Sequence, residues 1–369
     1  MTRDADARFM ALALSLGRRG LGRCWPNPAV GCVIVSGGRI IGRGRTADGG
    51  RPHAEVVALA EAGSAARGAT VYVTLEPCAH IGRTGPCAEA LVSAGVARVV
   101  VALGDPDPRV AGRGIARLRA AGVAVETGPG AEVAARDQAG FLCRITRSRP
   151  FVTLKLATTV DGRIATATGE SRWITGPEAR ARVHGLRASH DAVMVGGGTA
   201  RADDPMLDVR GRGEVPQPVR VVVSGGPSLP LDGRLARTAR AVPLWICHDI
   251  RATEARVAPW REAGAVLLAC EAVGRQVSLV AALEALAARG LTRVLCEGGG
   301  GLAASLLSAG LVDRLVTFQA GFAMGAEGTP AVAALGLGAL SEATRFTLHD
   351  VHRVGGDVMA TWDAPQPAA

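Results

Sequence analysis

Apolar runs alternate with segments of helical apolar spacing along the first half of the chain. Strand-like runs occupy 29–35, 70–76 and 97–103, and segments with a helical period occupy 53–63, 87–95 and 114–122. Gly63, Gly95 and Gly122 lie just past the ends of these helical segments, where a left-handed cap residue is favoured. The alternation predicts an α/β layer structure, preceded by an amphipathic helix within the first residues.

The pattern restarts after a polar, proline-containing stretch at 146–151, which predicts a domain boundary. Predicted strands then occupy 152–157, 191–197, 219–224, 242–248, 265–269, 292–299 and 314–320, and predicted helices occupy 177–188, 278–289 and 302–309. Because single cores stop growing near ~250 residues, a chain of 369 residues favours two domains. We expect one domain over 1–147, a second over 148–363, and a disordered tail at 364–369.

The composition is that of a globular protein, with 48% apolar and 20% charged residues. Charges interrupt the apolar N-terminal residues, and no apolar run approaches the ~20 residues of a membrane span. The eight cysteines are scattered, so thiols or metal ligands are favoured over a disulfide framework. We expect a soluble cytoplasmic protein with no membrane partner.

The formal net charge of +9 suits either nucleic acid or a phosphorylated small molecule. The arginines are spread along the whole chain and there is a single tyrosine, so no nucleic-acid surface is expected. Lys155 is the only lysine among 42 basic residues. Compositional drift could leave one lysine by chance, but arginine cannot replace a compact ammonium that is able to lose its proton. Lys155 is therefore a candidate catalytic residue.

A zinc-binding pattern lies in the first half. His53 and Glu55 open a helical segment, Cys78 follows an apolar run, and Cys87 begins the next helical segment. Three nitrogen and sulfur ligands leave a fourth tetrahedral position for water, which distinguishes catalytic from structural zinc. The pattern predicts His53, Cys78 and Cys87 as ligands. Glu55 is predicted to be the general acid/base that carries protons, as in zinc deaminases.

Each of these residues also has a purely structural interpretation. A histidine near a helix start often caps the helix, and cysteines in an apolar chain are often core residues. A structural zinc would need a fourth protein ligand, for which Cys24, Cys32 and His80 are candidates. Glu55 would then have no function, so the catalytic interpretation is favoured.

Three further residues are candidates for binding the substrate of this site. His80 and Arg83 lie in the loop between the cysteines, and either could meet a phosphate or a pyrimidine edge or could simply be solvated. Asn27 lies on a proline-bounded turn, where its amide either reaches the site or only forms the turn.

Glycine-rich segments follow two predicted strands of the second half. One, at 298–301, joins a strand to a helix, and the other, at 196–198, precedes Thr199 and the pair Asp203 and Asp204. Such glycines let backbone N–H groups approach an anion at a helix N-terminus, although a flexible connection is the alternative. No GxGxxG motif follows the first strand of this half, so a Rossmann fingerprint is absent.

These motifs resemble a known enzyme family over both halves. The first half resembles the deaminase of bifunctional riboflavin-biosynthesis deaminase/reductases through PNPAVGCVIV, PHAEVVAL, YVTLEPCAHIGRTGPC and DPDPRVAGRGIARLRAAG. The second half resembles their reductase through LKLATTVDGRIAT, GESRWIT, GGGTARADDPMLDVR and LCEGGGGLAASLLSAGLVDRL. The resemblance implies a cytidine-deaminase-like three-layer α/β domain followed by a dihydrofolate-reductase-like α/β domain.

The resemblance also implies the functional residues of the second half. The implied contacts with the cofactor NADPH are Ala157, Trp173, Thr199, Asp203, Ser224, Gly299, Gly300, Gly301, Leu302, Ala303, Ala304 and Ser305. The implied contacts with a phosphoribosyl substrate are Ser171, Leu207, Arg210 and Glu297. Arg210 suits a phosphate by its charge and fork geometry. Lys155, Asp203 and Glu297 are expected near the carbon that is reduced.

Two successive activities are implied. Zn²⁺-dependent hydrolysis would remove an amino group from a phosphoribosylated diaminopyrimidinone, and NADPH would then reduce the ribosyl group to ribityl. A homo-oligomer formed through the reductase domain is also expected. Thr46, Gly85 and Asp208 stand where the family commonly has His, Pro and Thr, which affects the expected substrate contacts and leaves the zinc ligands unchanged.

Two rival functions fit parts of the sequence. A nucleic-acid or nucleoside deaminase with a merely binding second domain leaves the glycine-rich segments of the second half unexplained. A non-catalytic binding protein stabilised by zinc requires that Glu55→Gln changes nothing. The bifunctional enzyme is favoured because it accounts for both halves.

Overall fold

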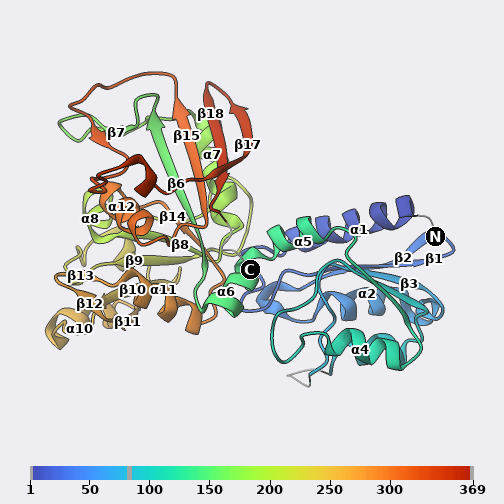
Figure 1. Cartoon of the computed structure of the whole chain (residues 1–369). Coiled ribbons are helices and arrows are strands. Elements are labelled where there is room, and N and C mark those ends of the chain that lie inside the picture. Colours follow the sequence, from blue (N-terminus) through green and yellow to red (C-terminus); the bar gives the residue numbers. More distant parts are fainter. Residues whose placement is uncertain (1–2, 81–84, 366–369) are drawn as a thin grey trace. The chain divides into compact units, whose positions relative to one another are not determined.

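The computed structural model describes residues 3–80 and 85–365 and divides into two compact units between Ser148 and Arg149 (Figure 1). Arg83 and the end of the predicted tail, residues 366–369, lie outside the described residues. Within the described part of the chain, no helix is both long and apolar enough to cross a membrane.

Unit 1 is built on a five-stranded sheet of order β2-β1-β3-β4-β5. Its strands are β1 (Gly31–Ser36), β2 (Arg39–Arg45), β3 (Thr70–Val73), β4 (Arg98–Val101) and β5 (Ala124–Thr127). Its α-helices are α1 (Arg3–Arg18), α2 (Ala54–Ala62), α3 (Cys87–Ser93), α4 (Arg113–Ala120), α5 (Ala131–Asp137) and α6 (Ala139–Arg147). Strand β1 is antiparallel to β2 and β3, whereas β3, β4 and β5 are parallel.

Successive residues of the central strands of unit 1 face opposite layers of helices. Cys32 and Val71 pack on one face with residues of α2, α3 and α4. Val33 and Tyr72 pack on the other face with residues of α1 and α5. The result is three layers, in which α1 and α5 lie on one side of the sheet and α2 and α4 on the other (Figure 1).

Unit 2 is built on a nine-stranded sheet of order β11-β10-β9-β8-β14-β6-β15-β18-β17. Its parallel strands are β6 (Phe151–Thr159), β8 (Ala192–Gly196), β9 (Val219–Val223), β10 (Leu244–Asp249), β11 (Val266–Cys270), β14 (Arg293–Cys296) and β15 (Arg314–Ala320). An antiparallel hairpin of β17 (Thr347–Val354) and β18 (Asp357–Asp363) extends the sheet beyond β15. Two short strand pairs are β7 (Arg163–Ala165) with β16 (Thr329–Pro330), and β12 (Ala272–Val273) with β13 (Gln276–Val277).

The α-helices of unit 2 are α7 (Pro177–Ala188), α8 (Gly197–Asp203), α9 (Arg234–Arg237), α10 (Glu254–Glu262), α11 (Leu279–Ala288) and α12 (Gly300–Ser308). Strand β14 lies between β8 and β6. Because β8 and β14 are parallel neighbours that lead directly into α8 and α12, the N-termini of these two helices lie at the same edge of the sheet. Lys155 lies on β6, beside this pair of strands.

The apolar pattern predicts most of these elements, with a few informative differences. Helix α12 begins at Gly300, two residues before its predicted start, because the glycine run itself forms the first turn. The pattern misses β2, β5 and the β17–β18 hairpin. Strand β2 is rich in Arg and Gly, while β5 and β17 are exposed along most of their length, so none of them shows the alternation of a half-buried strand.

Candidate functional site

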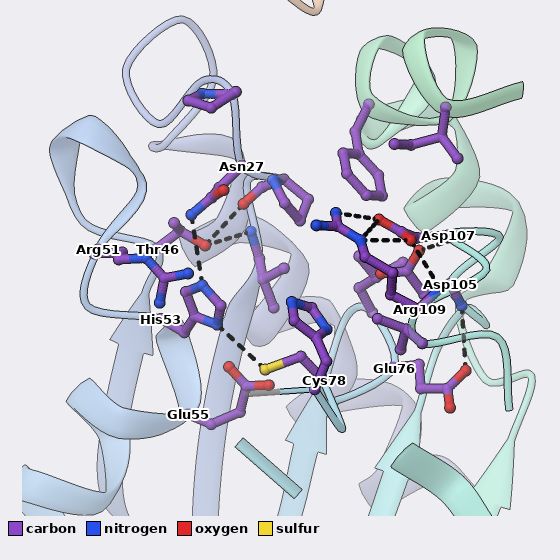
Figure 2. A pocket seen from close by; sticks show the side chains of 18 of the residues that line it. Asn27, Thr46, Arg51, His53, Glu55, Glu76, Cys78, Asp105, Asp107 and Arg109 are labelled. Carbon is purple, nitrogen blue, oxygen red and sulfur yellow. Dashed lines mark hydrogen bonds and ion pairs between the residues drawn. The ribbon is translucent and has the colours of Figure 1, made fainter. Parts of the chain in front are cut away.

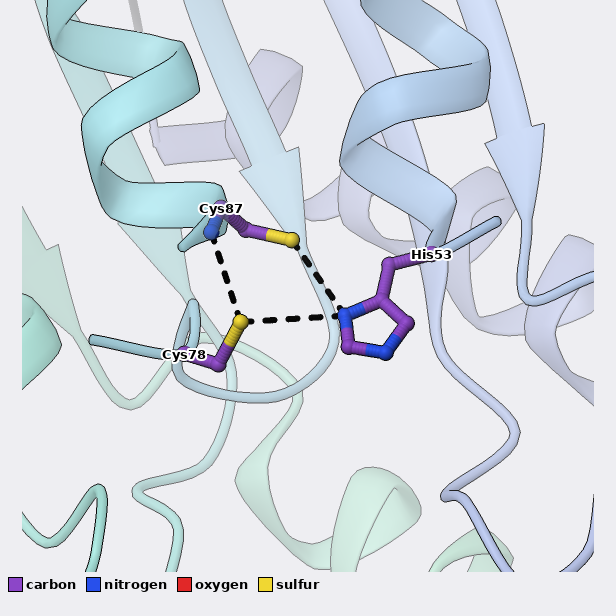
Figure 3. A group of neighbouring side chains, drawn as sticks. All are labelled: His53, Cys78 and Cys87. Carbon is purple, nitrogen blue, oxygen red and sulfur yellow. Dashed lines mark hydrogen bonds between the residues drawn. The ribbon is translucent and has the colours of Figure 1, made fainter. Parts of the chain in front are cut away.

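The three predicted zinc ligands converge in unit 1 (Figure 3). His53 is the N-cap of α2, Cys87 is the first residue of α3, and Cys78 lies in the loop after β3. The Nδ1 atom of His53 lies 3.3 Å from Cys87 Sγ and 3.7 Å from Cys78 Sγ, and all three ligand atoms lie within 4.8 Å of one another. One imidazole nitrogen and two thiol sulfurs at this spacing fit a tetrahedral zinc ion with one open position.

The donor set is that of a catalytic rather than a structural zinc. Among the described residues, the group that could hold a metal comprises only these three side chains, so Cys24, Cys32 and His80 do not supply a fourth ligand. The hydrogen bond between the two thiols lowers the pKa of Cys78 and raises the pKa of Cys87, so Cys78 is the member of the pair that more readily provides a thiolate for a metal.

A cavity of about 290 Å³ opens beside the cluster, and Glu55 lines it together with His53 and Cys78 (Figure 2). Glu55 is only 3% exposed, and this burial raises its pKa to about 7. A carboxyl group that titrates near neutral pH can both accept and donate a proton. Glu55 therefore has the position and the protonation behaviour of a general acid/base.

Two predicted substrate residues also line this cavity. Asn27 Nδ2 donates to the Gly50 carbonyl at 2.7 Å and lies 3.5 Å from His53 Nε2. The Nδ1 atom of His80 is buried and has no hydrogen-bond partner in the described part of the chain. The His80 side chain lines the cavity, so its imidazole is available to a ligand there. The third predicted residue, Arg83, lies outside the described residues.

The wall of the cavity that faces the zinc ligands is formed by residues that the sequence reasoning did not single out (Figure 2). Asp105, Asp107 and Arg109 follow β4, and Glu76 follows β3. Burial raises the pKa of Asp105 to about 6. These residues belong to the segments YVTLEPC and DPDPRVAG. The concentration of acidic residues after two adjacent parallel strands is the sequence feature that could have identified them.

Thr46, one of the departures from the family pattern, has a structural role on the side of the cavity that carries Asn27 and His53 (Figure 2). Its hydroxyl donates to the Pro28 carbonyl at 2.9 Å and accepts the Val30 N–H at 3.0 Å. Thr46 is only 2% exposed and lines the cavity. The hydroxyl therefore holds the loop before β1 against the end of β2.

In unit 2, two of the predicted reductase residues lie within electrostatic reach of each other. Burial lowers the pKa of Lys155, while the charge of Glu297 raises it and that of Arg187 lowers it further. Arg187, on α7, forms a bidentate ion pair with Glu297, with N–O distances of 2.6 and 3.0 Å. The sequence did not single out Arg187, because nothing distinguishes it from the other arginines of its helix.

The glycine-rich segments meet where α8 and α12 begin. The backbone N–H of Gly299 donates to the Thr199 hydroxyl at 3.0 Å, which ties the two helix N-termini together. A Cβ added at Gly198 or Gly301 would meet open space, so a ligand can approach the backbone there. The first turns of α8 and α12 thus have the geometry to receive a phosphate group.

The remaining predicted cofactor residues lie on several different elements of unit 2. Asp203 ends α8, and its carbonyl accepts a hydrogen bond from Arg172 at 3.2 Å. No hydrogen bond or ion pair joins Asp203 to Lys155 or Glu297 in the described residues. Trp173 is 68% exposed and stacks with Arg180. Ala157 is half-buried on β6, and Ser224 follows β9 and donates to the Gly226 carbonyl. Leu302, Ala303 and Ala304 lie inside α12, where the two alanines are buried. Ser305, also on α12, donates to the Gly301 carbonyl.

The predicted substrate residues of unit 2 differ in how far their side chains are exposed to solvent. The Arg210 guanidinium is largely exposed, and its Nε lies 3.3 Å from Asp208 Oδ1. Ser171 is half-buried. Leu207 is 3% exposed in the hydrophobic core, so only its main chain can meet a ligand.

Comparison with protein families identifies both halves. Residues 150–360 match the model of the RibD C-terminal domain, and residues 3–103 match the model of the cytidine and deoxycytidylate deaminase zinc-binding region. These matches confirm the expected folds, a cytidine-deaminase-like α/β unit followed by a dihydrofolate-reductase-like α/β unit.

Individual proteins match over the full length. The chain is 40% identical to the riboflavin biosynthesis protein RibD of Escherichia coli, over 96% of this chain and 98% of that protein. It is 39% identical to RibD of Aquifex aeolicus, over 97% of this chain and 98% of that protein.

Solved structures match equally well. Acinetobacter baumannii RibD has a TM-score of 0.89 at 38% identity, covering 99% of this chain and 100% of that one. The Thermotoga maritima diaminohydroxyphosphoribosylaminopyrimidine deaminase/5-amino-6-(5-phosphoribosylamino)uracil reductase has a TM-score of 0.87 at 32% identity, covering 98% of this chain and 99% of that one.

Proposed function

This chain belongs to the RibD family of bifunctional deaminase/reductases of riboflavin biosynthesis, and from that premise we propose how its two halves divide the chemistry. We assign hydrolytic deamination of a phosphoribosylated diaminopyrimidinone to residues 1–147. We assign the subsequent reduction of the ribosyl group to ribityl to residues 148–363, with NADPH as the reductant. The arrangement that carries the deaminase assignment is the cluster of His53, Cys78 and Cys87 with the buried Glu55 in the cavity beside it.

In the deaminase half, His53, Cys78 and Cys87 would hold Zn²⁺. When bound there, zinc supplies an activated water for attack on the carbon that bears the amino group. Glu55 would take a proton from that water and pass it to the amino group, which then leaves as ammonia, and its pKa near neutrality permits both transfers. Asn27, His80 and Arg83 would hold the pyrimidine and its phosphoribosyl group.

In the reductase half, the first turns of α8 and α12 would hold the NADPH phosphates, with Thr199 and 299–301 in contact. The remaining cofactor contacts would come from Ala157, Trp173, Asp203, Ser224 and 302–305. When bound, NADPH supplies the hydride. Lys155 and Glu297 bring a positive and a negative group to the sugar, where an ammonium can stabilise or protonate the oxygen that forms the new hydroxyl.

The substrate of the reductase would be held through Ser171, the main chain of Leu207, Arg210 and Glu297. Arg210 exposes most of its guanidinium, so it can form a bidentate contact with the phosphate. Arg187 holds the Glu297 carboxylate through two hydrogen bonds and thereby fixes its orientation.

Mass analysis of the products tests both assignments. With the diaminopyrimidine phosphate alone, we expect loss of one amino group as ammonia. With NADPH added, we expect a further gain of two hydrogens. Glu55→Gln should keep zinc bound and lower deamination by ~10² or more, the scale for losing a positioned acid/base. A Glu55→Gln protein with normal deamination would leave the non-catalytic zinc interpretation standing.

We also propose that the enzyme is a homo-oligomer that assembles through the β17–β18 hairpin. Helix α7 covers one face of this hairpin, around Met359 and Val354. On the opposite face, the register places Leu348, Val351 and Val358 together, and each is 43–50% exposed. An apolar sheet face at the edge strand is suited to a second copy of the chain related by two-fold symmetry.

Light scattering coupled to size exclusion measures this assembly. Leu348→Asp combined with Val351→Asp should shift the wild-type oligomer to a monomer. A monomeric wild type, or an unchanged oligomer in the double variant, contradicts the proposed interface. We further propose a cytoplasmic location, in keeping with eight cysteines of which none forms a disulfide.

A further inference from the structure

Glu76 is a buried carboxylate that the deaminase chemistry does not use. It follows β3, two residues before Cys78, and is only 4% exposed. Its own N–H donates to the Leu103 carbonyl at 2.9 Å, which holds it beside the end of β4. A buried carboxylate of this kind needs hydrogen-bond donors to offset its loss of hydration.

The donors come from the segment that leads from β4 into α4. The Glu76 carboxylate accepts the backbone N–H groups of Gly112 at 3.0 Å, Ile115 at 3.1 Å and Asp105 at 3.3 Å. Two of these donors stand at the start of α4, where the helix dipole also favours a negative charge. One side chain thus fastens both ends of the 105–112 loop.

The backbone packs equally closely at this point. A Cβ on Gly114 would lie 1.9 Å from the Pro77 carbonyl oxygen, so the first turn of α4 rests directly on the residue between Glu76 and Cys78. Glycine is required there because any side chain would separate the two segments. The segment from Glu76 to Cys78 therefore packs directly against the 105–112 loop and the start of α4.

The same loop forms the cavity wall that faces the zinc ligands (Figure 2). Within it, Asp105 Oδ1 accepts the Asp107 N–H at 2.8 Å, and Asp107 accepts the Arg109 N–H at 2.9 Å. Arg109 also donates to Asp107 through its side chain. The position of these side chains is set by the loop backbone, and the loop backbone is held by Glu76.

We propose that Glu76 is a positioning residue of the deaminase site, which fixes the 105–112 wall relative to the zinc ligands so that the cavity has the shape of its substrate. The inference rests on the deaminase activity proposed above. With three N–H groups already bound, the Glu76 carboxylate acts on the substrate through the loop and not by direct contact.

Glu76→Gln tests this role because it changes the side chain by a single group. The amide retains one oxygen acceptor, but its NH₂ faces a backbone donor that then has no acceptor. We expect the KM of deamination to rise ~10-fold or more, since the cavity wall is no longer held in the geometry for binding. The kcat, the zinc content per chain and the NADPH-dependent reduction should stay close to wild type.

Hydrogen exchange of the substrate-free protein distinguishes positioning from direct contact. Backbone amides of 105–112 should exchange faster in Glu76→Gln, because their tether is weakened before any substrate binds. The matched control is Glu89→Gln, which removes an exposed carboxylate that pairs with Arg117 of α4 and does not touch the loop. This control should show wild-type KM and exchange.

Each other result overturns the inference. An unchanged KM, a raised KM without faster exchange, or loss of zinc would mean that Glu76 acts otherwise than through the loop. If the wild type and Glu89→Gln also fail to deaminate, the proposed function itself fails, and the inference with it. Should Glu76→Gln not fold, Glu76→Asp, which keeps the charge on a shorter side chain, is measured in the same way.

Discussion

Lys155 lies on β6 among charges of both signs. It is half-buried, with Glu297 and Arg187 as the charged groups that affect its pKa. Burial disfavours the ammonium, and the carboxylate of Glu297 restores part of its stability. A guanidinium would add a wider, planar group beside Arg187 and could not give up a proton.

We therefore predict that Lys155→Arg lowers the rate of NADPH-dependent reduction at least ~10-fold, even though the charge is preserved. Steady-state NADPH oxidation measures the rate, and a thermal melt excludes misfolding. A normally folded Lys155→Arg enzyme with wild-type reductase kinetics would show that the lysine is incidental.

His190 makes the stability of unit 2 depend on pH. The imidazole is buried, its Nδ1–H donates to the Leu186 carbonyl at 2.7 Å, and its Nε2 accepts the Thr153 hydroxyl at 2.9 Å. Burial lowers its pKa to about 3. In the unfolded chain the pKa returns to ~6.5, so between these values the unfolded state binds the extra proton.

The free energy of unfolding should therefore fall as pH drops below ~6.5, by up to ~1.4 kcal/mol per pH unit from this group, and should not vary with this group above that pH. His190→Gln should reduce the slope between pH 5 and 6.5. Urea denaturation followed by tryptophan fluorescence measures it, because four of the five tryptophans lie in unit 2. Identical slopes in the two proteins would exclude His190 as the cause.

At the scale of elements, the glycines of β2 determine how closely α2 approaches the sheet. A Cβ on Gly44 would lie 2.1 Å from the Ala54 carbonyl oxygen, and one on Gly42 would lie 2.3 Å from that of Ala58. Helix α2 begins at Ala54, between the predicted zinc ligand His53 and the predicted acid/base Glu55. The absence of side chains at Gly42 and Gly44 thus lets the start of α2 lie beside the cysteines.

Gly44→Ala should displace the first turn of α2. We expect a loss of ~1–3 kcal/mol in the stability of unit 1, the usual cost of overpacking, together with weaker zinc binding. Thermal melts and metal content after dialysis against a mild chelator measure the two effects. Arg43→Ala on the same strand is the control, since it removes only an exposed ion pair. Normal zinc retention in Gly44→Ala would mean that α2 does not depend on this close approach.

At the scale of the whole molecule, the two sets of functional residues lie in separate units. The predicted zinc ligands belong to unit 1, and Lys155 and Glu297 belong to unit 2. Cys87→Ala should abolish zinc binding and deamination while reduction of supplied deaminated substrate continues at close to the wild-type rate. Cys24→Ala, at a buried cysteine outside the cluster, is the matched control and should retain both activities. Joint loss of both activities in a folded Cys87→Ala protein would contradict independent sites.

The sequence by itself determined the two α/β halves and predicted the zinc ligands and the acid/base. These features are carried by local patterns: apolar periodicity marks buried strands and helices, and His-x-Glu and Pro-Cys stand at fixed positions relative to predicted element ends. Lys155 stands out by composition alone. Such signals need no knowledge of which elements are neighbours.

Only the tertiary structure decided which side chains meet. Arg187 pairs with Glu297 across 110 residues, and Glu76 fastens a loop that begins 29 residues later. Helical spacing places Arg187 one turn after the buried Val183 but does not show which carboxylate it reaches. The exposed hairpin and the glycine-rich β2 escaped the pattern because edge strands bury too few side chains to alternate. Contacts between distant residues depend on the order and register of the strands. These are set by how all the elements pack together, and no single segment of the sequence specifies them.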